Sequence, residues 1–208
     1  MEKAVILLSG GMDSAVTLFY AKKKGYKTHC LIFDYGQRHK KEILCAKKLA
    51  RATKSKYYVL DINLPWKKSA LLDKNIRVPL NRDLRNGKQG IPPTYVPARN
   101  TIFISFALSF AEAIKASAIF IGANAIDFSG YPDCRPMYFR KFNELLKTAT
   151  KAKNIKIEMP LLHKTKKDIV KLGEKLKVPI EATWSCYKGG ARPCGKCDAC
   201  RLRDKAFL

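Results

Sequence analysis

The sequence predicts an α/β fold built on a doubly wound, five-stranded parallel sheet. Three observations support this prediction. Short apolar runs alternate with amphipathic segments along the 208 residues, a serine and two glycines follow the first apolar run, and apolar residues make up 47% of the chain. Alternating strands and helices favour a parallel sheet with helices on both faces. This length and apolar content suffice for one sizeable core, so we expect a single domain over residues 1–208.

The individual elements follow from hydrophobic periodicity. In chain order we expect strands at residues 3–8, 27–34, 57–60, 118–122 and 155–158, and helices at 13–24, 37–52, 99–115, 135–151 and 166–176. The helix at 99–115 is apolar nearly all round, which indicates burial by the sheet and by a second subunit of a homodimer. The irregular stretch 61–98 is expected to be a lid or a binding element. Disorder is the alternative for its charged middle, 81–90.

Residues 9–14, Ser-Gly-Gly-Met-Asp-Ser, connect the first strand to the first helix. A helix N-terminus offers free backbone N–H groups and the positive end of the helix dipole, which together bind anions. Gly10 and Gly11 allow the backbone to approach a phosphate, Ser9 and Ser14 add hydroxyl donors, and Asp13 sits where it can cap the helix. Ligands of such sheets bind beyond the carboxyl ends of the strands. We therefore predict a phosphate site here; a plain connecting turn is the alternative.

The chain is strongly basic, with 41 Lys and Arg against 17 Asp and Glu, a formal net charge of +24. Such a field attracts polyanions, yet the lysines are scattered as they are on solvated helix faces, so direct nucleic-acid binding is not established. No apolar stretch approaches the length of a membrane span, and the N-terminus does not resemble a signal peptide. We expect a cytoplasmic protein that does not associate with membranes.

Four of the seven cysteines lie close together near the C-terminus, in the spacing C-x7-C-x2-C-x2-C. In a cytosolic protein such clustering favours a metal over disulfides. Four thiolates suit tetrahedral Zn²⁺ in a closed, structural site; an iron–sulfur cluster, which uses the same ligand type, is the alternative. The segment at about 184–203 is therefore expected to hold one Zn²⁺ per chain, through Cys186, Cys194, Cys197 and Cys200.

The Ser-Gly-Gly-Met-Asp-Ser loop resembles the SGGxDS loop of the ATP-pyrophosphatase, or PP-loop, superfamily. The resemblance implies a sheet of the adenine-nucleotide α-hydrolase type and an ATP cofactor that is cut between its α- and β-phosphates, with Mg²⁺ on the phosphate oxygens and Asp13 near it. The nucleotide would be bound along the loop, the first helix and the ends of two further strands: Leu8, Ser9, Gly10, Gly11, Met12, Asp13, Ser14, Ala15, Val16, Thr17, Leu18, Phe33 and Gly122.

The whole chain is similar to the family of 7-cyano-7-deazaguanine synthases. The matching segments are SGGMDS (9–14), FDYGQRH (33–39), YVPARN (95–100), GANAIDFSGYPDCRP (122–136), MPLLHKTKKDIV (159–170) and WSCYKGG…PCGKCDACRLR (184–203). This resemblance implies a nitrile-forming, ATP-dependent C–N ligase acting on 7-carboxy-7-deazaguanine and ammonia through adenylated intermediates. The product, 7-cyano-7-deazaguanine, would serve queuosine or archaeosine synthesis in tRNA.

Candidate site residues follow from the same segments. Lys166 matches the family's lysine on the second phosphate-side motif, although Lys164 competes for the role, and Asp13, Arg99 and Lys166 are the candidate catalytic residues. A buried Arg99 needs an anion, either a substrate or an internal ion pair. A carboxylate can accept hydrogen bonds from the edge of a guanine-like ring, and an aromatic side chain can stack on the flat face of that ring. Such residues suit substrate binding. The candidates are Arg99, Asn100, Asp127, Phe128, Tyr131, Asp133 and Arg135; an ordinary turn is the alternative for those after the fourth strand.

Two other classes of function compete with the nitrile synthase. The first is a sister enzyme that modifies tRNA directly, which would use the net charge and a cysteine-bound cluster. The second is a non-enzymatic nucleic-acid-binding protein with a zinc ribbon, which would bind RNA in a salt-dependent way without cleaving ATP. The intact phosphate loop argues against the second class.

Overall fold

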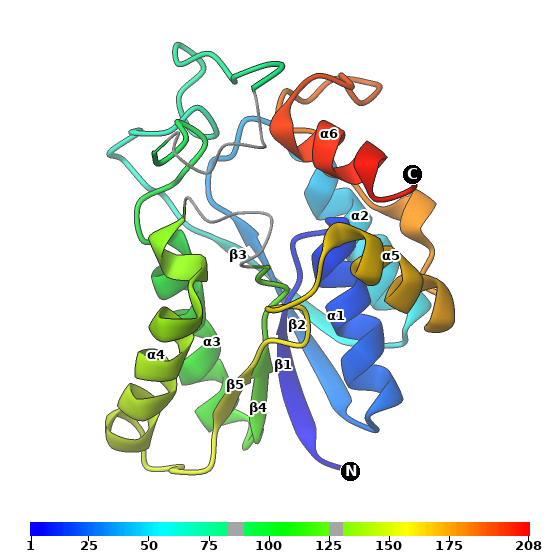
Figure 1. The fold of residues 1–208 in the computed structure, drawn as a ribbon. Coiled ribbons are helices and arrows are strands. Elements are labelled where there is room, and N and C mark those ends of the chain that lie inside the picture. The colour runs from blue at the N-terminus through cyan, green and yellow to red at the C-terminus, as the bar shows by residue number, and fades with distance from the viewer. Residues whose placement is uncertain (83–89, 125–130) are drawn as a thin grey trace.

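A computed structural model of the chain describes residues 1–82, 90–124 and 131–208 and contains one five-stranded sheet. All neighbouring strands are parallel and their order is β3-β2-β1-β4-β5. The bounds are β1 Lys3–Leu7, β2 Lys27–Asp34, β3 Lys56–Asp61, β4 Ala118–Phe120 and β5 Lys156–Glu158. The chain moves outward from β1 to β3 and then crosses to the other side of β1, which makes the sheet doubly wound, as predicted (Figure 1).

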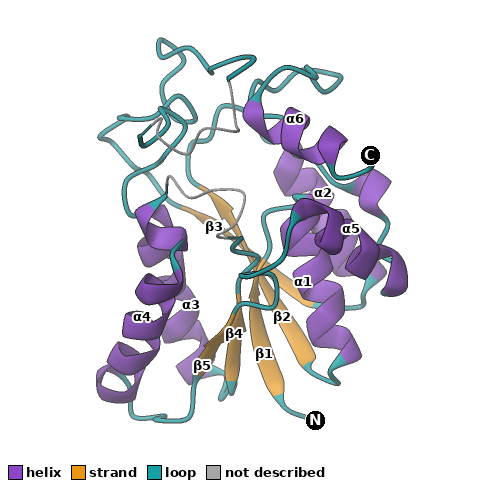
Figure 2. Cartoon of the chain, in the orientation of Figure 1, coloured by secondary structure: helices purple, strands orange, loops and turns teal. Residues whose placement is uncertain are grey.

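Helices cover both faces of the sheet (Figure 2). One face carries α1 (Met12–Lys23), α2 (Lys41–Ala52) and α5 (Lys166–Lys175), and the other carries α3 (Arg99–Ala113) and α4 (Pro136–Ala149). A separate apolar core fills each interface, the first around Leu18, Leu49 and Phe120 and the second around Ile104, Ile119 and Phe139. None of the described helices is long and apolar enough to cross a membrane.

Three local expectations were wrong. Helix α2 begins at Lys41 rather than at residue 37, because the Gln37 side chain holds the preceding turn: its Oε1 accepts from the Tyr35 backbone N–H at 2.7 Å, and its Nε2 donates to the Phe33 carbonyl at 3.1 Å. Helix α6 (Asp198–Lys205), on the C-terminal segment, was not predicted. Asp13 does not cap α1, whose N-cap is Gly11 without a side-chain cap.

The pairing of β1 with β4 places the loops that follow these two strands against each other. A Cβ on Gly122 would lie 2.9 Å from the Asp13 carbonyl carbon, and a Cβ on Gly10 would overlap the Glu42 carbonyl oxygen and lie 2.8 Å from the Ala46 nitrogen. Gly10 also has a φ of +83°, a left-handed conformation that costs a side-chain-bearing residue about 1–2 kcal/mol. Both loops are therefore closely packed at the carboxyl edge of the sheet.

We predict that Gly10→Ala destabilises the fold by about 3 kcal/mol, because strain at positive φ adds to overlap with the α2 backbone. Gly25→Ala is the matched control: Gly25 has a φ of +90° but nothing within 4 Å of an added Cβ, so only about 1 kcal/mol of strain is expected. Urea unfolding measures both values. Equal losses would show that the contact with α2 contributes nothing.

Candidate active site and metal centre

A cavity of about 280 Å³ opens at the carboxyl ends of β1, β2 and β4. Its walls include most of the loop after β1, namely Leu8, Ser9, Gly11, Met12, Asp13 and Ser14. Two further residues that were predicted to contact the nucleotide, Phe33 and Gly122 at the ends of the neighbouring strands, also line the cavity. Arg99, Asn100, Tyr131 and Lys166, predicted to serve catalysis or substrate binding, line the same cavity.

Other predicted contacts lie elsewhere. Ala15, Val16, Thr17 and Leu18 are fully buried within α1, away from the cavity. The buried Asp133 faces the start of α3, where its Oδ2 accepts from the Asn100 backbone N–H at 3.0 Å, and the exposed Arg135 is the N-cap of α4. Neither Asp133 nor Arg135 belongs to the described cavity wall. Asp127 and Phe128 lie outside the described residues.

One end of the cavity combines the N-termini of two helices. The loop before α1 is stabilised from within, because Ser14 Oγ donates to the Gly11 carbonyl at 2.9 Å and Ser9 Oγ donates to Ser14 Oγ at 3.0 Å. At the start of α5, Lys166 Nζ lies 2.5 Å from Asp13 Oδ2. A capping box between Thr165 and Asp168 stabilises this end of the helix. The Lys166 cation, hydroxyl groups and the N–H groups of helix N-termini thus face one region, an arrangement suited to phosphate.

Lys164, the competing lysine, is placed differently. It does not belong to the described cavity wall, and its backbone carbonyl accepts from Asn124 Nδ2 at 2.5 Å. The side-chain nitrogen that approaches Asp13 is therefore that of Lys166. A separation of 153 residues between Asp13 and Lys166 explains why the sequence alone left both lysines as candidates.

Another part of the cavity wall, which we call the cationic end, carries aromatic rings around one cation. Arg99 Nη1 donates to the Tyr35 hydroxyl at 3.1 Å, and Arg99 Cζ lies 5.7 Å from the Tyr35 ring centroid. Burial raises the pKa of Tyr35 to about 12, so its hydroxyl is neutral at pH 7. Within the described chain Arg99 forms no salt bridge, which favours a ligand anion over the internal ion pair.

Sequence reasoning missed several residues of the cavity wall. Among them are Tyr35, Glu42, Trp184 and Tyr187. Tyr35 belongs to the FDYGQRH segment and Glu42 follows that segment by three residues, while Trp184 and Tyr187 belong to the WSCYKGG segment. For Tyr35, Trp184 and Tyr187 the presence in segments already quoted was a signal, whereas Glu42 had none, and nothing in the sequence indicates which of these side chains point inward.

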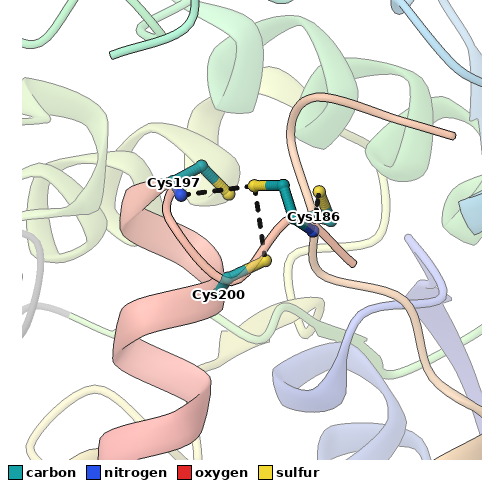
Figure 3. A group of neighbouring side chains, drawn as sticks. Cys186, Cys197 and Cys200 are labelled. Atoms are coloured by element: carbon teal, nitrogen blue, oxygen red, sulfur yellow. Dashed lines mark hydrogen bonds between the residues drawn. The ribbon is translucent and has the colours of Figure 1, made fainter. Parts of the chain in front are cut away.

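The four C-terminal cysteines converge as predicted. Their sulfur atoms all lie within 4.8 Å of one another, and the sulfurs of Cys194 and Cys200 are 4.0 Å apart. A tetrahedral Zn²⁺ with Zn–S bonds of about 2.3 Å requires sulfurs about 3.8 Å apart, so the observed set fits a metal. In Figure 3, Cys186, Cys197 and Cys200 turn their sulfurs toward a common space. The Cys197 backbone N–H donates to the Cys194 sulfur at 3.3 Å, which favours thiolate.

The cysteine segment also holds the long connection between β3 and α3. Leu80 forms an antiparallel bridge with Cys197, and Arg82 Nη1 lies 3.0 Å from Asp198 Oδ2. From the other side, Arg38 Nη2 donates to the carbonyls of Asp73 and Ile76 at 2.8 Å. The same segment contributes Trp184 and Tyr187 to the cavity wall. The segment that carries the cysteine cluster therefore also forms part of the cavity wall.

A doubly wound parallel sheet whose first strand leads through a glycine turn into a helix N-terminus, with a lysine from a later helix at the same point, defines the PP-loop class of nucleotide-binding folds. The family model described as "Queuosine biosynthesis protein QueC" matches residues 3–208. The chain belongs to this family.

Curated relatives are similar over the full length of the chain. The 7-cyano-7-deazaguanine synthase of Picrophilus torridus is 53% identical over 211 residues, covering 100% of this chain and 88% of the relative. The synthase of the same name from Thermoplasma acidophilum is 51% identical over 216 residues, again covering 100% and 88%. That of Thermosynechococcus vestitus is 50% identical and covers 99% and 91%.

Solved structures agree on the fold. The NMN synthetase of Francisella tularensis has a TM-score of 0.54 at 20% identity, covering 93% of this chain and 71% of that one. The U34-tRNA thiolase NcsA of Methanococcus maripaludis, solved with its [4Fe-4S] cluster, also has a TM-score of 0.54, at 17% identity, covering 99% and 64%. At these identities the likeness concerns the fold alone.

Proposed function

We propose that this protein converts 7-carboxy-7-deazaguanine and ammonia to 7-cyano-7-deazaguanine at the cost of ATP, in the pathway to queuosine or archaeosine. The observation that carries the proposal is one cavity with a phosphate-binding end, where Lys166 meets Asp13, and a separate cationic end at Arg99. Full-length relatives named as synthases of this nitrile support the choice of substrate. The reaction is that of an ATP-dependent C–N ligase.

The proposed reaction uses ATP twice, first to activate the substrate carboxylate and then to activate the amide. A substrate carboxylate oxygen attacks the α-phosphorus of ATP and pyrophosphate leaves; ammonia then displaces AMP and loses a proton, which gives the amide. The amide oxygen attacks a second ATP in the same way, and loss of AMP and a proton from the resulting imidate gives the nitrile. Each activation develops negative charge on the phosphates, which preorganised donors and cations in a cleft stabilise.

The proposed roles follow from position in the cavity. The backbone N–H groups of Gly10 and Gly11 and the hydroxyls of Ser9 and Ser14 would hold the pyrophosphate, and Lys166 would neutralise charge at the α-phosphate. Asp13 would approach the Mg²⁺ that accompanies ATP. Arg99 would bind the substrate carboxylate with its planar guanidinium. Mg²⁺ supplies charge neutralisation on the phosphate oxygens when bound.

We propose Zn²⁺ as the metal of the cysteine cluster, one per chain. Four protein thiolates leave no open coordination position, which is typical of a structural zinc site. Elemental analysis of the purified protein is expected to give one zinc per chain. Iron and acid-labile sulfide in place of zinc would favour the alternative of a sulfur-inserting tRNA enzyme.

The decisive test is a reaction with defined products. The protein, 7-carboxy-7-deazaguanine, an ammonium salt and Mg-ATP are expected to give the nitrile by mass spectrometry, with two AMP and two pyrophosphate per nitrile because each activation cleaves one ATP. Omitting ammonia is the matched control and should abolish nitrile formation. ATP cleaved to ADP, or no product mass at all, would contradict the proposal.

We propose further that two chains associate through the exposed side of α3 and the edge strand β3. Phe106 is 43% exposed and Tyr58 is 41% exposed, and with Leu60 and Ala113 they form a shallow apolar groove. Exposed apolar surface of this kind is typical of an interface. Light scattering after gel filtration should give a dimer, and Phe106→Glu should give a monomer. An exposed residue on α4, Leu145→Glu, is the control that should remain dimeric.

A further inference from the structure

One acidic side chain in the cavity wall forms no salt bridge within the described residues. The cavity walls described here contain two acids, Asp13 and Glu42. Asp13 pairs with Lys166, whereas Glu42, on the first turn of α2, forms no salt bridge within the described chain. In a protein of net charge +24, a carboxyl left unpaired inside a cavity is conspicuous. An unpaired charge in such a place is unfavourable unless a ligand compensates it.

The Glu42 carboxyl is held in one orientation. Its Oε1 accepts from Gln37 Nε2 at 3.2 Å, and Gln37 is itself fixed by its hydrogen bonds with the backbones of Tyr35 and Phe33. Oε2 has no hydrogen-bond partner among the described residues. The side chain therefore presents one fixed acceptor to the cavity. A positioned acceptor of this kind suits a ligand with N–H donors.

The electrostatic surroundings place Glu42 at the cationic end of the cavity. The groups that act on it are Arg99 of α3, Gln37 in the turn before α2, and Asp34 at the end of β2. Enclosure by the walls raises the pKa of Glu42 to about 7, although the Arg99 charge acts in the opposite direction. Lys166 and Asp13, at the phosphate end, are not among these groups. Glu42 thus belongs with Arg99 rather than with the bound triphosphate.

We propose that Glu42 accepts hydrogen bonds from the amidine edge of a guanine-like ring, its ring N–H and exocyclic amine, and thereby selects the substrate base. This inference rests on the proposed function and deepens it. Oε2 has two lone pairs and can accept from two adjacent N–H donors, while Arg99 provides the opposite charge for the substrate carboxylate in the same cavity. The neutral hydroxyl of Tyr35 and the ring of Tyr131, both in the wall, border the space for a flat ring.

The test combines a substitution of Glu42 with a ligand analogue that lacks the group Glu42 is proposed to bind. Binding of 7-carboxy-7-deazaguanine and of its analogue without the 2-amino group is measured by calorimetry for the wild type, Glu42→Gln and the exposed control Glu174→Gln. The wild type and the control are expected to prefer the amino-bearing ligand by about 10–100-fold. In Glu42→Gln this preference should fall to about 1, with ATP affinity unchanged.

Each other outcome overturns the inference. Equal weakening of both ligands in Glu42→Gln would assign Glu42 a structural role. Glu42→Gln could instead keep the preference for the amino-bearing ligand and bind ATP more weakly. If its binding of a nucleotide without the 6-amino group were unaltered, Glu42 would be assigned to recognition of the adenine. Failure of the wild type to bind either ligand would overturn the proposed function as well, whereas a retained preference in Glu42→Gln overturns only this inference.

A second readout separates ligand recognition from support of the fold. A carboxyl whose folded-state pKa is raised contributes stability that is fully present below its unfolded pKa and is lost as pH rises through about 7. The melting temperature of the ligand-free wild type should therefore fall between pH 6 and pH 8. At pH 8 the melting temperature of Glu42→Gln should be higher than that of the wild type. A lower melting temperature for Glu42→Gln at pH 8 would contradict the assignment.

Discussion

Replacing Lys166 by methionine is expected to lower the rate of ATP cleavage about 100- to 1,000-fold, the loss typical when one preorganised charge-stabilising group is removed. Lys166 Nζ lies 2.5 Å from Asp13 and largely out of solvent, next to the start of α1. Without it, the Asp13 carboxylate faces the phosphates uncompensated, so the change adds repulsion to the loss of attraction. Methionine retains the apolar length of the side chain. Release of AMP and pyrophosphate at saturating ATP measures the effect.

Lys164→Met is the matched control, two residues away in the same segment. Its backbone carbonyl keeps the contact with Asn124, and its side chain lies outside the described cavity wall. The rate should change less than threefold, consistent with a screened surface charge. The reverse result, an inactive Lys164→Met and an active Lys166→Met, would exchange the roles of the two lysines.

Replacing Cys197 by serine is expected to abolish metal binding and to cause the largest loss of stability of any single change considered. Structural zinc in small sites contributes apparent free energies of about 10–16 kcal/mol. Cys197 is fully buried, bridges to Leu80 and is the N-cap of α6. Loss of the metal should therefore release both the cysteine segment and the connection before α3. Metal content, thermal unfolding and limited proteolysis at residues 66–82 are the measurements.

Cys45→Ser is the control for this second experiment. Cys45 is half-buried and packs against the same cluster without being one of the four converging cysteines. Its replacement should leave one metal per chain and change the free energy of unfolding by only about 1 kcal/mol. Retention of the metal and of the wild-type melting temperature by Cys197→Ser would show that the cluster is not a metal site.

Features encoded over short stretches were predictable from the sequence. The strand–glycine–helix order at residues 3–24 and the spacing of Cys194, Cys197 and Cys200 each specify local geometry, because a tight turn or a short ligand spacing leaves the backbone few alternatives. The alternation of strands and helices similarly determined a parallel, doubly wound sheet. Helix boundaries were less accurate where a side chain competes with the backbone, as Gln37 does before α2.

Assignment of individual side chains to the cavity depended on the tertiary structure. Asp133 was predicted to bind substrate, but it accepts from the α3 backbone, whereas Glu42 was not among the predicted site residues and lines the cavity. The choice between Lys164 and Lys166 likewise rests on a contact across 153 residues. The sequence by itself determined the fold class, the phosphate loop and the cysteine cluster, because their geometry is local. Which charges meet in the cavity depends on how the crossovers bring distant loops together, and only the folded chain decides that.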